Sequence, residues 1–195
     1  MHRLSAAFFL GYHGCDSAVA NALISGSDFK PSNNDYDWLG PGIYFWEANP
    51  VRGLEFAKEL RALKRGPAIA TPAVVGAVIE PGLCLDLTTS AGIQHVREAH
   101  GRLVEIAATA GYPLPKNSPD PDKLRRNLDC AVITLLHQVR REAGEPPIDT
   151  VRGVFIEGQP IFGGSGFRDK THIQICVCNP DCIKGVFRVP ASQLT

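Results

Sequence analysis

Two glycine-containing segments near the N-terminus most constrain what this chain can fold into. The first, Gly-Tyr-His-Gly-Cys over residues 11–15, follows an apolar run over residues 6–10 that we interpret as the first β-strand. The second, over residues 39–45, sets an aromatic pair directly after a glycine-rich turn. Histidine and side-chain-free backbone supply hydrogen bonds, and an aromatic ring supplies a stacking face. The two segments together predict a binding site for a flat ligand with polar edges.

The remaining pattern of apolar residues and turn signals predicts an α+β chain. We expect one helix over about 18–25 and a second over about 50–65, with Asn49 as the N-cap of the second. Apolar residues at helical spacing predict a further helical pair, separated by a proline-rich linker, within an insert over about 89–144. Strands are expected on both sides of that insert, over 74–79, 83–87, 151–156, 172–178 and 185–189.

Length and charge narrow the class of protein. The 195 residues suit a single domain over 1–195, and twenty basic and twenty acidic residues give zero formal net charge. This balance argues against a broad phosphate-binding surface. No segment resembles a membrane span, and the run over 6–10 has no cleavage region of a signal peptide after it, so a cytoplasmic location is expected. The six cysteines lack paired C-x2-C spacing, which favours reduced core residues and no metal site.

The motif order identifies a family resemblance. His-Gly at 13–14, a short helix, and then Gly-x-Gly-Ile-Tyr-Phe over 40–45 resembles the NAD-binding core of the PARP-type (diphtheria-toxin-like) ADP-ribosyltransferases. The resemblance covers about 6–87 and 151–189 and leaves the insert without a counterpart. It implies an ADP-ribosyltransferase-like split β-sheet core with a helical insert, and NAD+ as co-substrate without a metal.

The resemblance also implies roles for individual residues. In the family, the histidine matching His13 bonds the nicotinamide-ribose hydroxyls, the glycine matching Gly14 pairs with the carboxamide, and the tyrosine matching Tyr44 stacks on the nicotinamide ring. A basic residue at the place of Lys30 reaches the diphosphate. The residues expected to contact NAD+ are His13, Gly14, Lys30, Gly42, Tyr44 and Phe56.

A third catalytic group is harder to assign. The family usually carries a glutamate at the start of the strand after the acceptor-facing loop, but the strand expected here contains no acid. A gap-free match puts His172 at that position, Gln174 shares its face, and Glu157 opens the loop. We favour Gln174 and Glu157 over His172, so the predicted catalytic set is His13, Tyr44, Glu157 and Gln174.

The expected activity is mono-ADP-ribosyl transfer from NAD+ to a macromolecular or small-molecule acceptor, with release of nicotinamide. Small versions of the family are often bacterial toxins or defence proteins, which implies an antitoxin or immunity protein as partner. Two alternatives stay open. One is a tRNA 2′-phosphotransferase-like enzyme, which shares the fold and uses NAD. The other is a non-catalytic module that binds NAD or ADP-ribose, which the missing strand glutamate favours.

Overall fold

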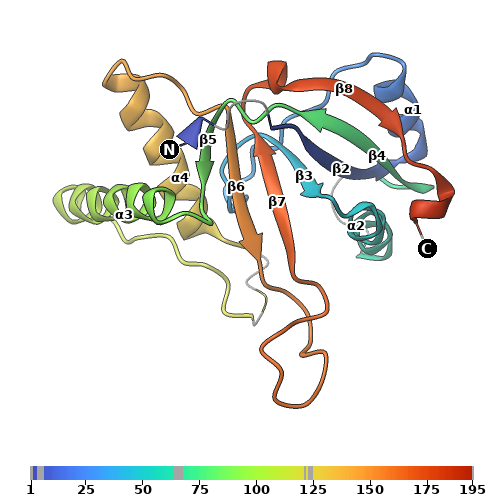
Figure 1. Cartoon of the computed structure of the whole chain (residues 1–195). Coiled ribbons are helices and arrows are strands. Elements are labelled where there is room, and N and C mark those ends of the chain that lie inside the picture. The colour runs from blue at the N-terminus through green and yellow to red at the C-terminus, as the bar shows by residue number, and fades with distance from the viewer. Residues whose placement is uncertain (1, 4–6, 64–67, 121, 123–124, 195) are drawn as a thin grey trace.

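The computed structural model describes residues 2–3, 7–63, 68–120, 122 and 125–194 (Figure 1). Within these residues, eight strands form one mixed sheet in the order β1-β5-β6-β7-β3-β2-β4-β8, in which β5 and β6 run parallel and the other neighbours antiparallel. The α+β class expected from the sequence is confirmed. The strands are β1 His2–Arg3, β2 Phe9–Asp16, β3 Ile43–Glu47, β4 Pro72–Ile79, β5 Leu83–Asp86, β6 Thr150–Phe155, β7 His172–Val177 and β8 Ile183–Arg188.

The sheet consists of two halves with a short junction. β2 and β3 pair at Gly11↔Glu47 and Tyr12↔Trp46 alone among the described residues, whereas β2 follows β4 along its whole length. Beyond this junction, the His13 ring spans the space between the strands, with its Nδ1 2.9 Å from the carbonyl oxygen of Tyr44. One half of the sheet therefore contains β2, β4 and β8, and the other contains β3, β7, β6, β5 and β1. Near the predicted site, few contacts join the two halves.

Helices α1 (Ser17–Ile24) and α2 (Pro50–Leu63) lie beside the β2-β4-β8 half (Figure 1). Their N-termini follow the capping signals in the sequence: the Asp16 carboxylate accepts from Ala18 N at 2.9 Å, and Asn49 Oδ1 accepts from Arg52 N at 3.0 Å. Both predicted helices are confirmed, although the end expected at about residue 65 lies outside the described residues. Short 3₁₀ turns follow at Pro180–Cys182 and Ala191–Gln193.

Helices α3 (Ser90–Ala110) and α4 (Asn127–Glu142) occupy the predicted insert and lie at the other half of the sheet (Figure 1). Leu103 of α3 and Ile133 of α4 belong to one buried cluster that also contains Leu85 and Val151 of the sheet. Their apolar stripes therefore pack on each other and on one sheet face, as helices with such stripes must to bury them.

The first strand differs from its prediction. The apolar run over residues 6–10 was expected to form the strand, but β2 begins at Phe9 and continues to Asp16, and residue 6 lies outside the described residues. Pairing with β4 provides partners for the backbone through His13 and Gly14, so tertiary contact extends the strand beyond its apolar part. His13 is thus inside a strand rather than at its end.

No described helix is long and apolar enough to cross a membrane. The described residues contain no cluster of three or more histidine, cysteine or carboxylate groups arranged to hold a metal ion. All six cysteines are free, and all except the half-buried Cys178 are buried.

Candidate functional site

One face of the three central strands gathers the polar and aromatic side chains of interest. The register pairs Trp46 of β3 with Gln174 of β7, and His172 of β7 with Phe155 of β6. Since side chains alternate along a strand, these four residues and Tyr44 share a face. We call this surface the β3-β7-β6 face.

The first wall of this face comes from the polar loop before β3. Trp38 lies over the sheet and donates its indole N–H to Gln174 Oε1 at 2.8 Å. Its ring centroid is 5.2 Å from that of Phe155, and the Arg126 guanidinium lies over both rings, at 4.9 and 4.4 Å. Gly153 permits this approach because a Cβ there would be 3.0 Å from the Trp38 ring.

The opposite wall comes from α2 and carries a buried ion pair. Arg52 Nη2 lies 3.1 Å from Glu157 Oε2, and both residues are buried, with exposed fractions of 5% and 7%. Arg52 also contacts Glu59 at 3.3 Å, and Glu59 accepts from Lys170 Nζ at 3.0 Å. The negative charge of Glu157 is therefore compensated by a guanidinium rather than directed alone into a site.

Three buried nitrogens of α2 and the adjoining strands β3 and β7 have no hydrogen-bond partner among the described residues: Arg52 Nε, Trp46 Nε1 and His172 Nε2. They belong to neighbouring side chains, since the Trp46 and His172 rings are 6.2 Å apart and the Arg52 charge acts on His172. Leaving a buried polar group unpaired costs about 1 to 3 kcal/mol. A buried polar atom of this kind bonds to an ordered water or a ligand, so these three side chains are candidates to contact a polar ligand.

The protonation of His172 follows from its contacts. Its Nδ1 lies 2.6 Å from the carbonyl oxygen of Lys170, and a carbonyl oxygen only accepts, so Nδ1 carries the hydrogen. Burial lowers the pKa of His172 to about 4, with the Lys170 bond opposing the shift. The ring is therefore neutral near pH 7, and its unpaired Nε2 is a hydrogen-bond acceptor beside two donors.

The two predicted residues His13 and Tyr44 are in contact, but His13 bonds the backbone carbonyl of Tyr44 and not its ring. The His13 ring packs against Phe29 and Phe45, at 5.5 and 5.7 Å, on the face opposite the Tyr44 ring. Burial lowers the pKa of His13, so its Nδ1 donates to the Tyr44 carbonyl and its Nε2 is an acceptor. The Tyr44 hydroxyl accepts from Leu39 N at 3.0 Å and donates to Gly40 O at 2.8 Å, which fixes the preceding turn.

The other predicted contact residues have different surroundings. A Cβ on Gly14 would lie 2.0 Å from Gly53 O, so its bare backbone faces α2. Gly42 similarly lies against Cys176 and Val177 of β7. Phe56 of α2 packs against the Trp46 ring at 4.8 Å, near the unpaired nitrogens. Lys30 is exposed and forms none of the described contacts of this face.

The structure thus gathers Tyr44, Phe56, Glu157 and Gln174 at the β3-β7-β6 face and leaves Lys30 outside it. Sequence reasoning missed five members of the face: Trp38 as a partner of Gln174, Trp46, Arg52, Arg126 and Phe155. The sequence offered a signal for Trp46, which lies two residues after Tyr44 and so shares its face if the segment is extended. Arg52 and Glu157 are 105 positions apart, and no local pattern links them.

Comparison with known proteins gives a distant relative. The chain is 27% identical over 195 residues to the uncharacterized protein MJ0359 of Methanocaldococcus jannaschii, an alignment that covers 89% of this chain and 83% of the relative. No family model matches the chain, and no solved structure matches it. The case for a function therefore depends on the residues of the β3-β7-β6 face.

Proposed function

We propose that the protein is an NAD+-dependent mono-ADP-ribosyltransferase of the cytoplasm whose nicotinamide site is at the β3-β7-β6 face. The observation that carries the proposal is the set of three unpaired buried nitrogens on Trp46, Arg52 and His172. The motif resemblance at residues 13–14 and 40–45 suggests NAD+ as the ligand. The three nitrogens are the groups to which its polar atoms would bond.

The hydrogen-bond roles of the three nitrogens suit a carboxamide. The indole of Trp46 and Nε of Arg52 are donors, and Nε2 of His172 is an acceptor. The carboxamide of nicotinamide presents an oxygen that accepts and an NH2 group that donates. Because the three nitrogens are buried, ligand entry involves movement of the side chains that cover them, and Phe56 is one neighbour in contact with Trp46.

The proposed reaction needs little acid or base. The bond between ribose C1′ and the nicotinamide nitrogen breaks, its electron pair leaves with neutral nicotinamide, and an oxocarbenium-like ribosyl cation forms. A nucleophile of the acceptor then bonds to C1′ and loses its proton. Gln174 is assigned to a ribose hydroxyl, and Glu157 to stabilisation of the cation as Arg52 shifts its contacts. His13, whose ring lies on the opposite face of the sheet, is assigned to holding the Tyr44 backbone through its Nδ1 bond. Tyr44 is assigned to stacking.

The acceptor is proposed to be a protein or a small molecule, since zero formal net charge disfavours a wide nucleic-acid surface. A role as a toxin or defence protein, with an antitoxin or immunity protein as partner, is part of the same proposal and comes from the resemblance.

One observation favours a second candidate, a non-catalytic binder of NAD or ADP-ribose. Glu157, the carboxylate assigned to the cation, is held by Arg52 in a buried pair. A carboxylate that stayed in this pair would contribute less to stabilising a ribosyl cation, whereas ligand binding would be unaffected.

Adenylate-labelled NAD+ incubated with the full chain and cell lysate tests the proposal. A transferase moves label to lysate material and releases nicotinamide, and separate protease and nuclease digestion identifies the acceptor class. Gln174→Ala should abolish most transfer, while Gln138→Ala, an exposed glutamine on α4, is the matched control. Saturable NAD+ binding without nicotinamide release supports the binder instead, and absence of both binding and release contradicts both candidates.

A further inference from the structure

A cavity of about 410 Å³ lies between α3, α4 and the loop that carries Trp38, the same loop that forms the first wall of the β3-β7-β6 face. This volume falls within the range of roughly 300 to 1,000 Å³ that small-molecule pockets occupy. Most of its lining is apolar and comes from the insert and the end of the adjoining strand: Leu87, Ile93, Val96, Leu128, Val132 and Ile133.

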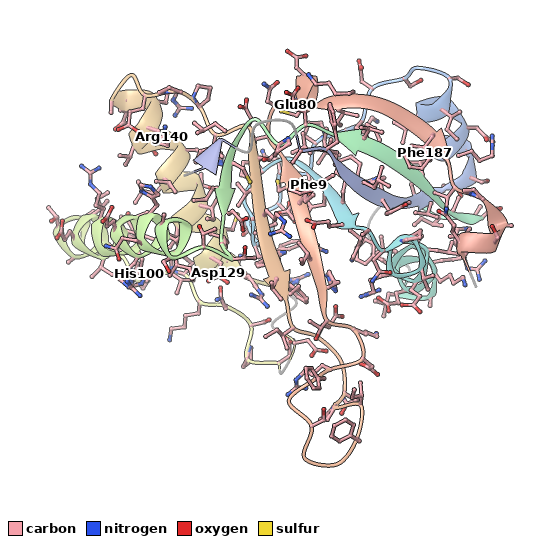
Figure 2. All side chains as sticks on the ribbon, in the orientation of Figure 1. Phe9, Glu80, His100, Asp129, Arg140 and Phe187 are labelled. Atoms are coloured by element: carbon pink, nitrogen blue, oxygen red, sulfur yellow. The ribbon has the colours of Figure 1, made fainter. Side chains whose placement is uncertain are left out.

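Charged and polar side chains complete the lining. Arg97 and His100 come from α3, and Arg126 and Asp129 come from the start of α4. Figure 2 shows His100 and Asp129 on the same side of the helix pair. Arg126 and Asp129 form an ion pair at 3.6 Å and compensate each other, so the charge that remains for a ligand is the exposed guanidinium of Arg97. The lining is therefore apolar with a net positive edge.

We propose that this cavity binds a small organic anion with an apolar body and a single acidic group. Apolar walls of this kind bind by excluding water from the ligand body, and a few polar groups set its orientation. The acid would face Arg97, which holds one bond to the described residues, from its Nη1 to Gln94 Oε1 at 2.7 Å, and has further N–H donors. The body would lie against Trp38 and the apolar residues of α4.

Trp38 connects the cavity to the candidate site. The residue lines the cavity, and its indole N–H bonds Gln174 on the β3-β7-β6 face. A ligand in the cavity would therefore contact the residue that orients the Gln174 amide. The cavity proposal stands on this lining and does not require that the protein act on NAD+.

The test uses 1-naphthoate as the anionic probe and 1-naphthylmethylammonium as its cationic counterpart, each titrated calorimetrically into the full chain. The chain has two tryptophans, so ¹⁵N-labelled protein gives two indole N–H resonances, which a Trp46→Phe variant assigns. We expect saturable naphthoate binding, weaker binding of the cation, and a larger shift of the Trp38 resonance than of the Trp46 resonance.

Matched variants of α3 locate the site. Arg97→Glu should weaken naphthoate binding about tenfold or more, while Arg102→Glu makes the same charge change on an exposed arginine outside the lining and should leave it unchanged. Val96→Trp should fill the cavity and remove binding. The proposal is overturned if naphthoate does not bind, if both charge variants bind it as the wild type does, or if the Trp46 resonance alone responds.

Discussion

Trp38 and Gln174 are 136 positions apart, and the indole N–H of the first donates to the side-chain oxygen of the second at 2.8 Å. This bond ties the polar loop before β3 to the middle of β7. Because an indole is a donor only, the bond also fixes the orientation of the Gln174 amide, with its oxygen toward Trp38 and its NH2 end left to donate to a ligand.

Removing the Gln174 amide tests whether this side chain bonds a ribose hydroxyl during transfer. Gln174→Ala should lower ADP-ribosyl transfer on the order of 10² to 10³-fold and change NAD+ affinity little, because the group acts mainly in the transition state. Trp38→Phe should give a smaller loss, since it removes the orienting bond but keeps an aromatic ring beside Phe155 and Arg126. Transfer rates and NAD+ binding measured on both variants check this. A normal rate in Gln174→Ala together with a dead His172→Ala would assign the third group to His172.

Removal of the Arg52 guanidinium should destabilise the fold strongly. Arg52→Ala leaves Glu157 buried without its partner, and breaking a buried pair from one side commonly costs about 3 to 5 kcal/mol. Urea unfolding of the variant measures the loss.

The control is the double variant Arg52→Met with Glu157→Leu, which removes both charges and restores apolar contact. It should recover most of the lost free energy of unfolding. A double variant as unstable as Arg52→Ala would mean that the pair is not the source of the effect.

Alanine should destabilise the protein at one strand glycine, Gly14, and have little effect at another, Gly185. Gly14→Ala places a Cβ 2.0 Å from the carbonyl oxygen of Gly53, so α2 must shift, at a cost of about 1 to 3 kcal/mol or more. Gly185→Ala on β8 is the matched control, because its Cβ would meet nothing within 4 Å. Thermal unfolding of the two variants should show a large loss for the first and little change for the second. Equal melting temperatures would contradict the close packing of α2 on β2.

Acid should destabilise the protein through His172. Its pKa is about 4 in the fold and 6.5 in a model peptide, so the unfolded state binds the proton first as pH falls. The free energy of unfolding therefore decreases between about pH 6.5 and 4, by at most about 3 kcal/mol from this group. Unfolding of the wild type and of His172→Phe, which cannot titrate, should show a shallower pH dependence for the variant. Parallel curves would mean that another group causes the loss.

Two substitutions separate the contribution of the Tyr44 ring from that of its hydroxyl. Tyr44→Phe keeps the ring and removes the bonds to Leu39 N and Gly40 O, so stability should fall by about 1 to 2 kcal/mol. If the ring stacks on nicotinamide, NAD+ affinity should stay near the wild-type value in Tyr44→Phe and fall in Tyr44→Ala. His13→Ala should also weaken binding, because it removes the bond that holds the Tyr44 backbone in place. Unchanged affinity in both alanine variants would reject the proposed NAD+ site.

Much of the local structure could be predicted from the sequence. The cap at Asn49, the two early helices, and the apolar stripes of α3 and α4 depend on residues close together in the chain, so local patterns predict them. The α+β class follows from the same patterns. The extent of β2 was not predictable in this way, because its pairing with β4 rather than its own composition carries it through His13 to Asp16.

The candidate site was decided mainly by tertiary structure. Sequence reasoning named Tyr44, Glu157 and Gln174, but only the fold shows that Arg52 compensates Glu157, that Trp38 orients Gln174, and that His13 and Tyr44 direct their rings to opposite faces. Burial, charge pairing and the absence of a partner for Trp46 Nε1 are properties of groups brought together from distant segments. The sequence by itself determines which polar and aromatic residues the protein has. Packing determines which of their polar atoms are left without a partner in the fold and can therefore bond to a ligand.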